Sequence, residues 1–288
     1  MKIYIANESK KQIGGGYSFV RNFIKGCKNN AEITDNIYNC EIFFIPSASM
    51  TSKDLVRQAF ELKKKIVLRV DNVLKDSRNR GNGMNRFFEF ASMADLIIYQ
   101  SEWCSNYLGY ALKWRNLEKS SEIILNGTDR DIFKPEGARM RKTGSPQYLY
   151  TRFNKEETKN WHYVYYEYQM IQRLNPEASL WLLGNFSREM VQYNFDFFDN
   201  ENVRHLGIAS CPEAMAMYLR SCDELLLPYY NDACSQTAIE ARCCGTKINA
   251  MGYGISGGTP EILRVDLRVL DYRTMTNRYL EAFKKLLC

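Results

Sequence analysis

Short apolar runs alternate along this chain with longer stretches in which apolar and polar positions mix at helical spacing. Most of the short runs are continuously apolar, which is the pattern of strands covered on both faces. Strands are predicted at residues 2–7, 41–47, 65–71, 95–101, 122–127, 147–152, 179–185, 203–207, 224–230 and 247–252, with a weaker run at 268–272. Helices are predicted at 17–28, 52–63, 84–93, 103–112, 160–174, 187–197, 212–221, 235–244 and 274–287. Such alternation predicts an α/β fold with parallel sheets.

The 288 residues are enough for two compact domains. A polar segment at 136–146 contains two glycines and a proline, and it separates two series of strands and helices. We therefore predict a first domain over 1–143, a second over 144–272, and a final helix within 273–288 that can pack back on the first. Two sheets facing each other would enclose a cleft, a common place for a small-molecule site.

Composition narrows the class of protein. No apolar run approaches the roughly 20 residues that span a bilayer, and the N-terminus lacks the apolar region and cleavage site of a signal peptide. This predicts a protein made and kept in the cytoplasm. The nine cysteines form no C-x-x-C pair, and the chain has only two histidines. We therefore expect reduced thiols that pack as small hydrophobic groups, and no metal site.

Charge is distributed unevenly between the two predicted halves. Residues 1–143 contain 24 Lys and Arg and 16 Asp and Glu, a net charge of +8, whereas residues 144–288 contain 15 and 17, a net charge of −2. A basic first half indicates an anionic partner. A surface helix that is simply rich in lysine would give the same count, so both interpretations stay open.

The segment 224–263 is the most informative part of the chain. A buried strand ends in a polar loop that contains Asp232, and a helix opens near Ser235, Gln236 and Thr237. The free N–H groups and dipole of a helix N-terminus suit a phosphate. Glu240, one turn further on, could accept hydrogen bonds from ribose hydroxyls, and Asp232 could bind sugar hydroxyls. Taken alone, Glu240 is equally explained as a glutamate favoured by the helix dipole.

This segment resembles the signature of the retaining GT-B glycosyltransferases of family GT4. Their pattern is an acidic residue, seven residues, a glutamate, A-x-x-C-G-T-P and later G-G-x-P-E. The matching positions are Asp232, Glu240, Ala241, Cys244, Gly245, Thr246, Gly257, Gly258, Pro260 and Glu261. The chain departs from the family in having Asp at 232 where Glu is usual, Lys247 where Pro is common, and a loop without glycine-phenylalanine-glycine. The resemblance implies the GT-B fold, with two facing Rossmann-like domains.

Other matches follow in the order that this family has. Residues 150–161 resemble the segment that supplies an Arg and a Lys to the donor diphosphate, which implies Arg152 and Lys159, with Lys155 as a competing candidate. Gly15 and Gly16 belong to a Gly-Gly-Gly run that resembles the family's first glycine-rich loop, although it could equally just start a helix. Further resemblance lies at 123–137, the stretch that closes the first domain in the family.

Two further positions follow from their places at strand ends. Gly184 ends a predicted strand at the edge where open parallel sheets bind ligands, and we expect it near the donor. Asp71 ends another strand, in the region where many such enzymes have a histidine near the reacting sugar. It could orient the acceptor or the sugar, or serve only as a loop cap. The loop that follows contains Arg78 and Arg80, which we expect to attract an anionic acceptor.

The resemblance implies a retaining transfer of a sugar from a UDP- or GDP-sugar to an acceptor hydroxyl, without cofactor or essential metal. The acceptor would be a glycan or an anionic molecule. One alternative is a transferase that acts on modified bases of DNA. The other, from a different class, is a catalytically silent GT-B module that binds sugar or nucleic acid.

Overall fold

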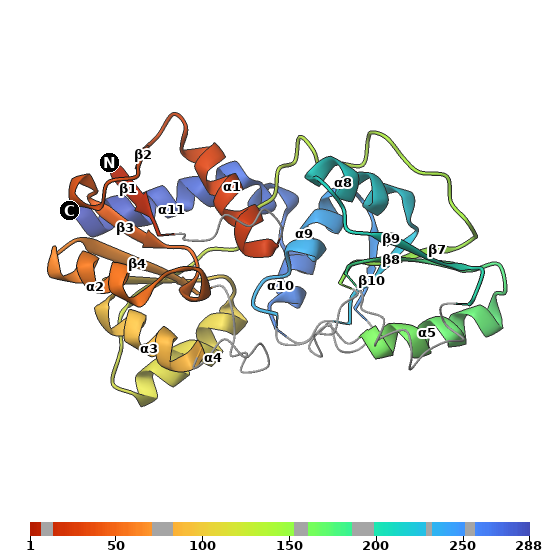
Figure 1. The fold of residues 1–288 in the computed structure, drawn as a ribbon, viewed down its shortest axis with the longest axis horizontal. Coiled ribbons are helices and arrows are strands. Elements are labelled where there is room, and N and C mark those ends of the chain that lie inside the picture. Colours follow the sequence, from red (N-terminus) through yellow and green to blue (C-terminus); the bar gives the residue numbers. More distant parts are fainter. Residues whose placement is uncertain (7–13, 71–82, 153–160, 186–198, 229–231, 251–256) are drawn as a thin grey trace. The chain divides into compact units, whose positions relative to one another are not determined.

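A computed structural model describes the chain except for residues 7–13, 71–82, 153–160, 186–198, 229–231 and 251–256 (Figure 1). By their contacts the residues form two compact units. The first unit comprises Met1–Thr128, Asp232–Gln236 and Arg264–Cys288, and the second comprises Asp129–Asn231 and Thr237–Leu263. The chain thus passes between the units four times, and the C-terminal helix belongs to the first.

The first unit is a six-stranded sheet in the order β2-β1-β3-β4-β5-β6, with all its strands parallel. Its strands are β1 (Lys2–Ile5), β2 (Glu32–Thr34), β3 (Ile42–Ile45), β4 (Lys65–Val70), β5 (Leu96–Tyr99) and β6 (Ser120–Ile123). Its helices are α1 (Gly15–Cys27), α2 (Lys53–Glu61), α3 (Gly83–Met93), α4 (Glu102–Trp114) and α11 (Tyr272–Leu287). The predicted α/β fold with parallel sheets is confirmed.

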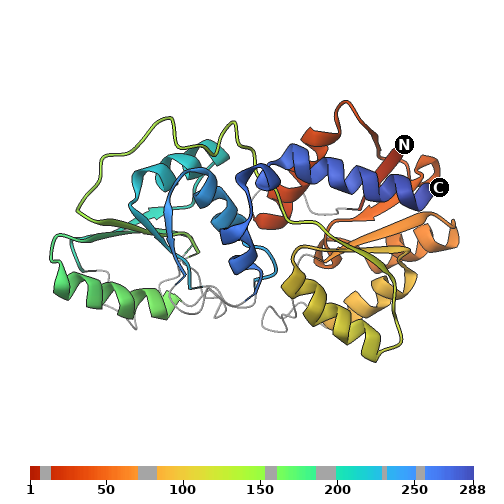
Figure 2. The same ribbon diagram turned by 180° about the vertical axis from the view of Figure 1, so that it is seen from behind.

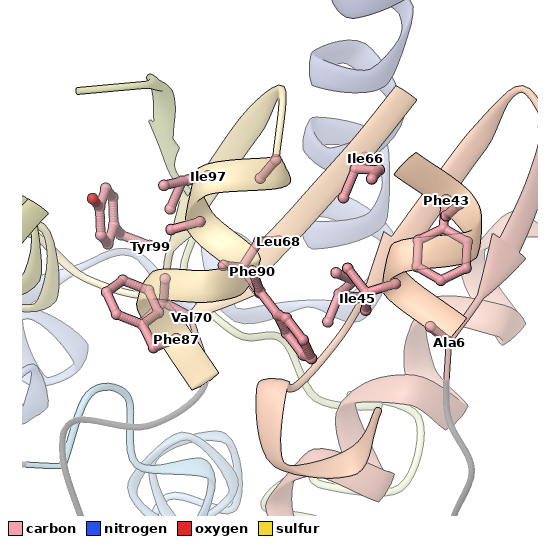
Figure 3. Close-up of a cluster of buried hydrophobic side chains, with 14 of the residues drawn as sticks. Ala6, Phe43, Ile45, Ile66, Leu68, Val70, Phe87, Phe90, Ile97 and Tyr99 are labelled. Atoms are coloured by element: carbon pink, nitrogen blue, oxygen red, sulfur yellow. The ribbon is translucent and has the colours of Figure 1, made fainter. Parts of the chain in front are cut away.

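Two hydrophobic clusters cover the two faces of this sheet, which explains its continuously apolar strands. Phe43 and Ile45 of β3 pack with Phe90 of α3 and Val56 of α2 on one face (Figure 3). The alternate residue Phe44 packs on the other face, against α1 and α11. Neighbouring strands repeat this alternation, so both faces of each central strand are buried.

The second unit has a five-stranded sheet in the order β11-β10-β7-β8-β9, again with all strands parallel (Figure 2). Its strands are β7 (Gln147–Tyr150), β8 (Ser179–Leu183), β9 (Val203–Gly207), β10 (Glu224–Leu226) and β11 (Lys247–Asn249). Its described helices are α5 (Trp161–Leu174), α8 (Pro212–Ser221), α9 (Gln236–Cys243) and α10 (Thr259–Arg264). The first residue of α9, Gln236, and the last residue of α10, Arg264, are grouped with the first unit.

Strand order gives each sheet a point where successive connections run in opposite directions. In the first unit the chain leaves β1 for β2 on one side, and β3 then pairs with β1 on the other. In the second unit β7 pairs with β8 on one side and with β10 on the other. Open α/β sheets bind ligands outside the carboxyl ends of the strands at such switch points.

The segment that follows Thr128 packs on the second unit through Arg220 of α8. The buried Arg220 guanidinium donates hydrogen bonds to the carbonyl oxygens of Ile132 (3.2 Å) and Ala138 (3.1 Å). Gly137 adopts a φ of 129° beside it, where a Cβ would lie 3.1 Å from the Arg220 Cζ. These contacts hold the polar connection against helix α8 of the second unit.

Three elements differ from the sequence-based expectation. Residues 268–272 form no strand, because Leu267–Leu270 is a 3₁₀ turn and Tyr272 begins α11. The strand β2 was not predicted, since its three residues Glu32–Thr34 include one apolar side chain, Ile33, and are largely exposed at the sheet edge. The short helix α10 was also missed. The predicted helix at 187–197 lies outside the described residues.

All nine cysteines are free thiols, and seven of them are buried. Burial raises the pKa of the Cys27, Cys222 and Cys244 thiols to about 12, so these groups stay protonated and behave as small apolar side chains. Among the described residues, no helix has the length and apolar character needed to cross a membrane.

Helix α11 packs along α1, and aromatic side chains fill the contact. Phe19 and Phe23 of α1 meet Tyr279 of α11 with ring centroids 5.5 and 5.6 Å apart. Gly26 of α1 faces the buried Thr276 of α11, and a Cβ on Gly26 would lie 2.6 Å from the Cβ of Thr276. Only glycine fits there without movement of one helix.

We therefore predict that Gly26→Ala destabilises the protein by about 1–3 kcal/mol, because the added methyl group forces α1 and α11 apart. Gly109→Ala in α4 is the matched control, since a Cβ there meets nothing closer than the Tyr99 hydroxyl oxygen at 3.6 Å. It should stabilise the protein by about 0.5–1 kcal/mol through helix propensity. Urea unfolding measures both changes, and effects of the same sign and size would contradict the prediction.

Candidate functional site

A buried arginine organises the carboxyl edge of the first unit's sheet. Arg69, in β4, is 2% exposed, and its guanidinium lies 3.7 Å from the centre of the Phe19 ring. Its Nη1 donates to the carbonyl oxygen of Pro46 (2.8 Å), and its Nη2 donates to Gln100 Oε1 (2.9 Å) and Asn126 Oδ1 (2.8 Å). Within the described ranges no carboxylate pairs with it. Its charge is therefore distributed over neutral oxygens.

The partners of Arg69 are themselves joined. Gln100 donates to the carbonyl oxygen of Val70, and Asn126 donates to Gln100 Oε1 at 2.6 Å and to the carbonyl oxygen of Cys234 at 3.4 Å. Pro46, Val70, Gln100 and Asn126 end or follow four neighbouring strands. We call Arg69, Gln100 and Asn126 the arginine network. It fixes the loops at this edge relative to one another.

The sequence analysis did not identify Arg69. A signal was present, because this arginine interrupts the otherwise apolar run KIVLRV, and an arginine within a buried strand needs several acceptors. The nearby Tyr279 hydroxyl is fully buried. Burial raises its pKa, and the positive charge of Arg69 opposes that rise.

The three consecutive glycines open α1 next to the first unit's switch point. Gly14 has a φ of 132°, which only glycine adopts readily, and its carbonyl oxygen accepts from the N–H of Tyr17 and of Ser18. A Cβ on Gly16 would lie 2.9 Å from the Met50 sulfur. A Cβ on Gly15 would lie 3.8 Å from Cβ of Gln236. The structure thus brings together Gly15 and Gln236, two residues predicted to bind the donor.

Other residues predicted to bind the donor lie at or lead from the second unit's switch point. Arg152 follows β7 directly and is half-buried, and its carbonyl oxygen accepts a hydrogen bond from the Tyr150 hydroxyl (3.0 Å). The paired strand β10 leads through Pro228 toward Asp232 and α9. Arg152 and the connection into α9 therefore leave adjacent strands at the same edge of the sheet.

Gly184 follows β8, and its backbone is committed to the sheet. Its N–H donates to the carbonyl oxygen of Gly207 (2.8 Å), and its own carbonyl oxygen lies 3.0 Å from Nε2 of His205. Desolvation lowers the pKa of His205, and the contact with the Gly184 carbonyl opposes that shift. Since both groups are engaged, Gly184 would contribute to a ligand site through its lack of a side chain.

Helix α9 begins one residue later than predicted, and its first residues are buried. Ser235, Gln236, Thr237 and Glu240 are all less than 9% exposed. Asp232 precedes them and accepts from the N–H of Cys234 (3.3 Å), which turns the chain into the helix. The helix ends at Gly245, with a φ of 74°. A glutamate that only interacted favourably with the helix dipole would normally keep its carboxylate exposed to water. The burial of Glu240 is therefore unusual for that role alone.

Several predicted residues lie outside the described residues: Asp71, Arg78, Arg80, Lys155 and Lys159. Their assigned roles stay predictions. Among the residues that the structure does describe, no group of three or more His, Cys, Asp or Glu side chains could hold a metal ion.

The sequence matches no protein-family model and no curated relative. The structure, in contrast, resembles solved glycosyltransferases over nearly its whole length. HepE of Anabaena, solved in complex with UDP, matches with a TM-score of 0.67 and 15% identity over 100% of this chain and 92% of that one. Sucrose-phosphate synthase from Thermosynechococcus elongatus matches with a TM-score of 0.66 and 14% identity, over 99% of this chain and 94% of that one.

The catalytic domain of starch synthase IV from Arabidopsis thaliana, bound to ADP and acarbose, matches with a TM-score of 0.62 and 11% identity over 99% of both chains. These neighbours are GT-B glycosyltransferases. Their likeness, together with the two parallel Rossmann-like sheets, shows that this chain has the GT-B fold, as the sequence resemblance implied.

Arg69→Met should destabilise the first unit by about 2–4 kcal/mol, because three buried oxygens each lose a charge-assisted hydrogen bond, and of these Gln100 Oε1 still accepts from Asn126. Arg268→Met is the control, since the Arg268 side chain is 84% exposed and pairs only with Asp266. It should change stability by less than about 0.5 kcal/mol. Denaturant unfolding compares the two variants, and an Arg69→Met protein as stable as the parent would show that the network adds nothing.

Proposed function

We propose that this protein is a glycosyltransferase that moves a sugar from a nucleotide sugar to an acceptor hydroxyl. The observation that carries the proposal is the second unit's switch point, where Arg152 and the connection into α9 leave the adjacent strands β7 and β10. The signature residues Asp232, Thr237 and Glu240 lie on that connection and helix. Solved proteins of the same fold hold UDP or ADP.

In this proposal the second unit binds the donor. The N–H groups at the start of α9, near Ser235, Gln236 and Thr237, face the diphosphate, where the helix dipole favours negative charge. Glu240, one turn into the helix, accepts hydrogen bonds from the ribose hydroxyls. A buried carboxylate suits this role because hydroxyl donors replace the water that it has lost.

Transfer breaks the bond between the anomeric carbon and the diphosphate oxygen, and the electron pair stays on that oxygen. Arg152 and Lys159 stabilise the charge that develops there. The acceptor oxygen bonds to the anomeric carbon, and its proton passes to the departing diphosphate oxygen. Asp232 holds hydroxyls of the transferred sugar. We propose retention of configuration, with protein cations rather than a metal ion on the diphosphate.

The acceptor belongs to the first unit, and charge indicates its nature. The first unit contains 25 Lys and Arg and 17 Asp and Glu, a net charge of +8, whereas the second contains 14 and 16, a net charge of −2. We propose an anionic acceptor that Arg78 and Arg80 attract and that Asp71 orients.

Thermal-shift measurements with UDP, GDP and ADP test the donor site. A nucleotide at a hundred times its dissociation constant should add about 2.7 kcal/mol of stability. Glu240→Ala should abolish most of this gain while the unliganded protein melts near the parent. The matched control is Glu213→Ala, which removes a glutamate from the first turn of α8 in the same unit. Equal nucleotide responses in both variants would mean that Glu240 only supports its helix.

Arg152→Ala should lower kcat by about a hundredfold and change the unfolding midpoint little, because the guanidinium acts on charge that grows in the transition state. Steady-state kinetics measured by nucleotide release check this. Lys159→Ala should act alike, and Lys155→Ala should be mild. A severe Lys155 variant beside a mild Lys159 variant would move the clamp to Lys155.

A further inference from the structure

Helix α4 carries a stripe of large aromatic side chains on its outer surface. Trp103, Tyr107, Tyr110 and Trp114 follow at spacings of four, three and four residues, which places them on one face of the helix. We call these four residues the aromatic stripe. The opposite face, with Cys104, Leu108 and Leu112, is buried in the hydrophobic core. Of the stripe, Trp103 also packs against this core, so the core accounts for one face of α4 and for Trp103 but leaves Tyr107, Tyr110 and Trp114 unexplained.

Exposure increases along the stripe. Tyr107 is 47% exposed, Tyr110 is 74% exposed and Trp114 is 80% exposed, while Trp103 is half-buried. The Trp103 and Tyr107 rings lie parallel, 5.5 Å apart and inclined by 8°. The stripe is thus a continuous apolar surface along the helix. Large exposed patches of this kind mark interaction sites in soluble proteins.

The residue types indicate what the stripe contacts. All four side chains are Trp or Tyr, which combine an apolar ring with one polar group and gather where an apolar phase meets water. The aliphatic residues that would enter a hydrocarbon interior are absent from the stripe. This composition fits the headgroup region of a bilayer better than its core.

Charge indicates the kind of bilayer. Lys113 and Arg115 flank Trp114, and the Lys113 side chain is 73% exposed. The first unit as a whole carries +8. A membrane surface with anionic lipids attracts such a unit, by about 1 kcal/mol per basic residue near the surface.

The second unit offers a contrast. Its helix α5 also exposes apolar side chains, including Tyr166 (64%) and Met170 (55%), but that unit has a net charge of −2. The complementarity with an anionic surface therefore favours α4 over α5.

We propose that α4 docks the first unit on the surface of a membrane that contains anionic lipids, with the aromatic stripe at headgroup level. The helix lies along the surface and does not span the bilayer. Docking would present the first unit to acceptors held in the membrane. The proposal does not depend on glycosyl transfer, since it follows from exposure, residue type and charge alone.

Tryptophan fluorescence reports this contact directly. The chain has four tryptophans, of which Trp161 and Trp181 are at most 6% exposed and serve as internal references. Vesicles of phosphatidylcholine mixed with phosphatidylglycerol should shift the emission of Trp103 and Trp114 to shorter wavelength and carry the protein upward in flotation. Pure phosphatidylcholine should bind much less, and added salt should weaken binding to the mixed vesicles.

The variant Tyr110→Gln with Trp114→Gln should lower vesicle binding about tenfold or more, because it removes most of the exposed aromatic area. Both positions are exposed, so unfolding should change little. The matched control is Tyr166→Gln with Met170→Gln in α5, which should bind like the parent. Failure of the parent to bind mixed vesicles would overturn the proposal, as would equal losses in both variants. A stripe-dependent response to a soluble polyanion, with none to vesicles, would assign the surface to a polymer instead.

Discussion

In the part of the chain that the structure describes, one guanidinium group is buried without a carboxylate partner, and it determines the carboxyl edge of the first sheet. Moving an ion out of water costs several kcal/mol even after relaxation. Arg69 offsets this cost with charge-assisted hydrogen bonds of about 1.5–3 kcal/mol each and with the face of the Phe19 ring. Because its acceptors come from the ends of different strands, they stabilise the charge only in their observed positions. The loops above this edge therefore start from fixed points.

In the second unit, Arg220 has the same role as Arg69 in the first: it is a buried cation that holds irregular segments in place. It too is buried, and its acceptors are backbone carbonyl oxygens of the connecting segment. Both arginines hold polypeptide that has no regular secondary structure of its own.

The elements that were predictable from sequence are those determined by residues close to one another in the chain. The runs at β3 and β4 predicted parallel strands because each is covered on both faces, and covered strands are apolar throughout. Helix α9 was predictable because its loop, its start and Gly245 follow one another within fifteen residues. In contrast, β2 is a strand only because β1 provides a partner, and the run at 268–272 is apolar because a turn packs on one side. Arg69 was missed because its partners lie 23 to 57 positions away.

Because the two units differ in net charge, they would attract an anion in two different ways. The second unit has a net charge of −2, so its overall field does not favour a diphosphate. In the proposed function, affinity there comes from groups at contact distance, such as the N–H groups at the start of α9 and the Arg152 guanidinium, which salt screens little. The first unit acts through +8 spread over its surface, and such a field is screened beyond about 8 Å at physiological ionic strength. The proposed donor site would therefore depend on the geometry of a few atoms, whereas the proposed attraction of an acceptor or a membrane to the first unit would depend on many charges and need no precise arrangement.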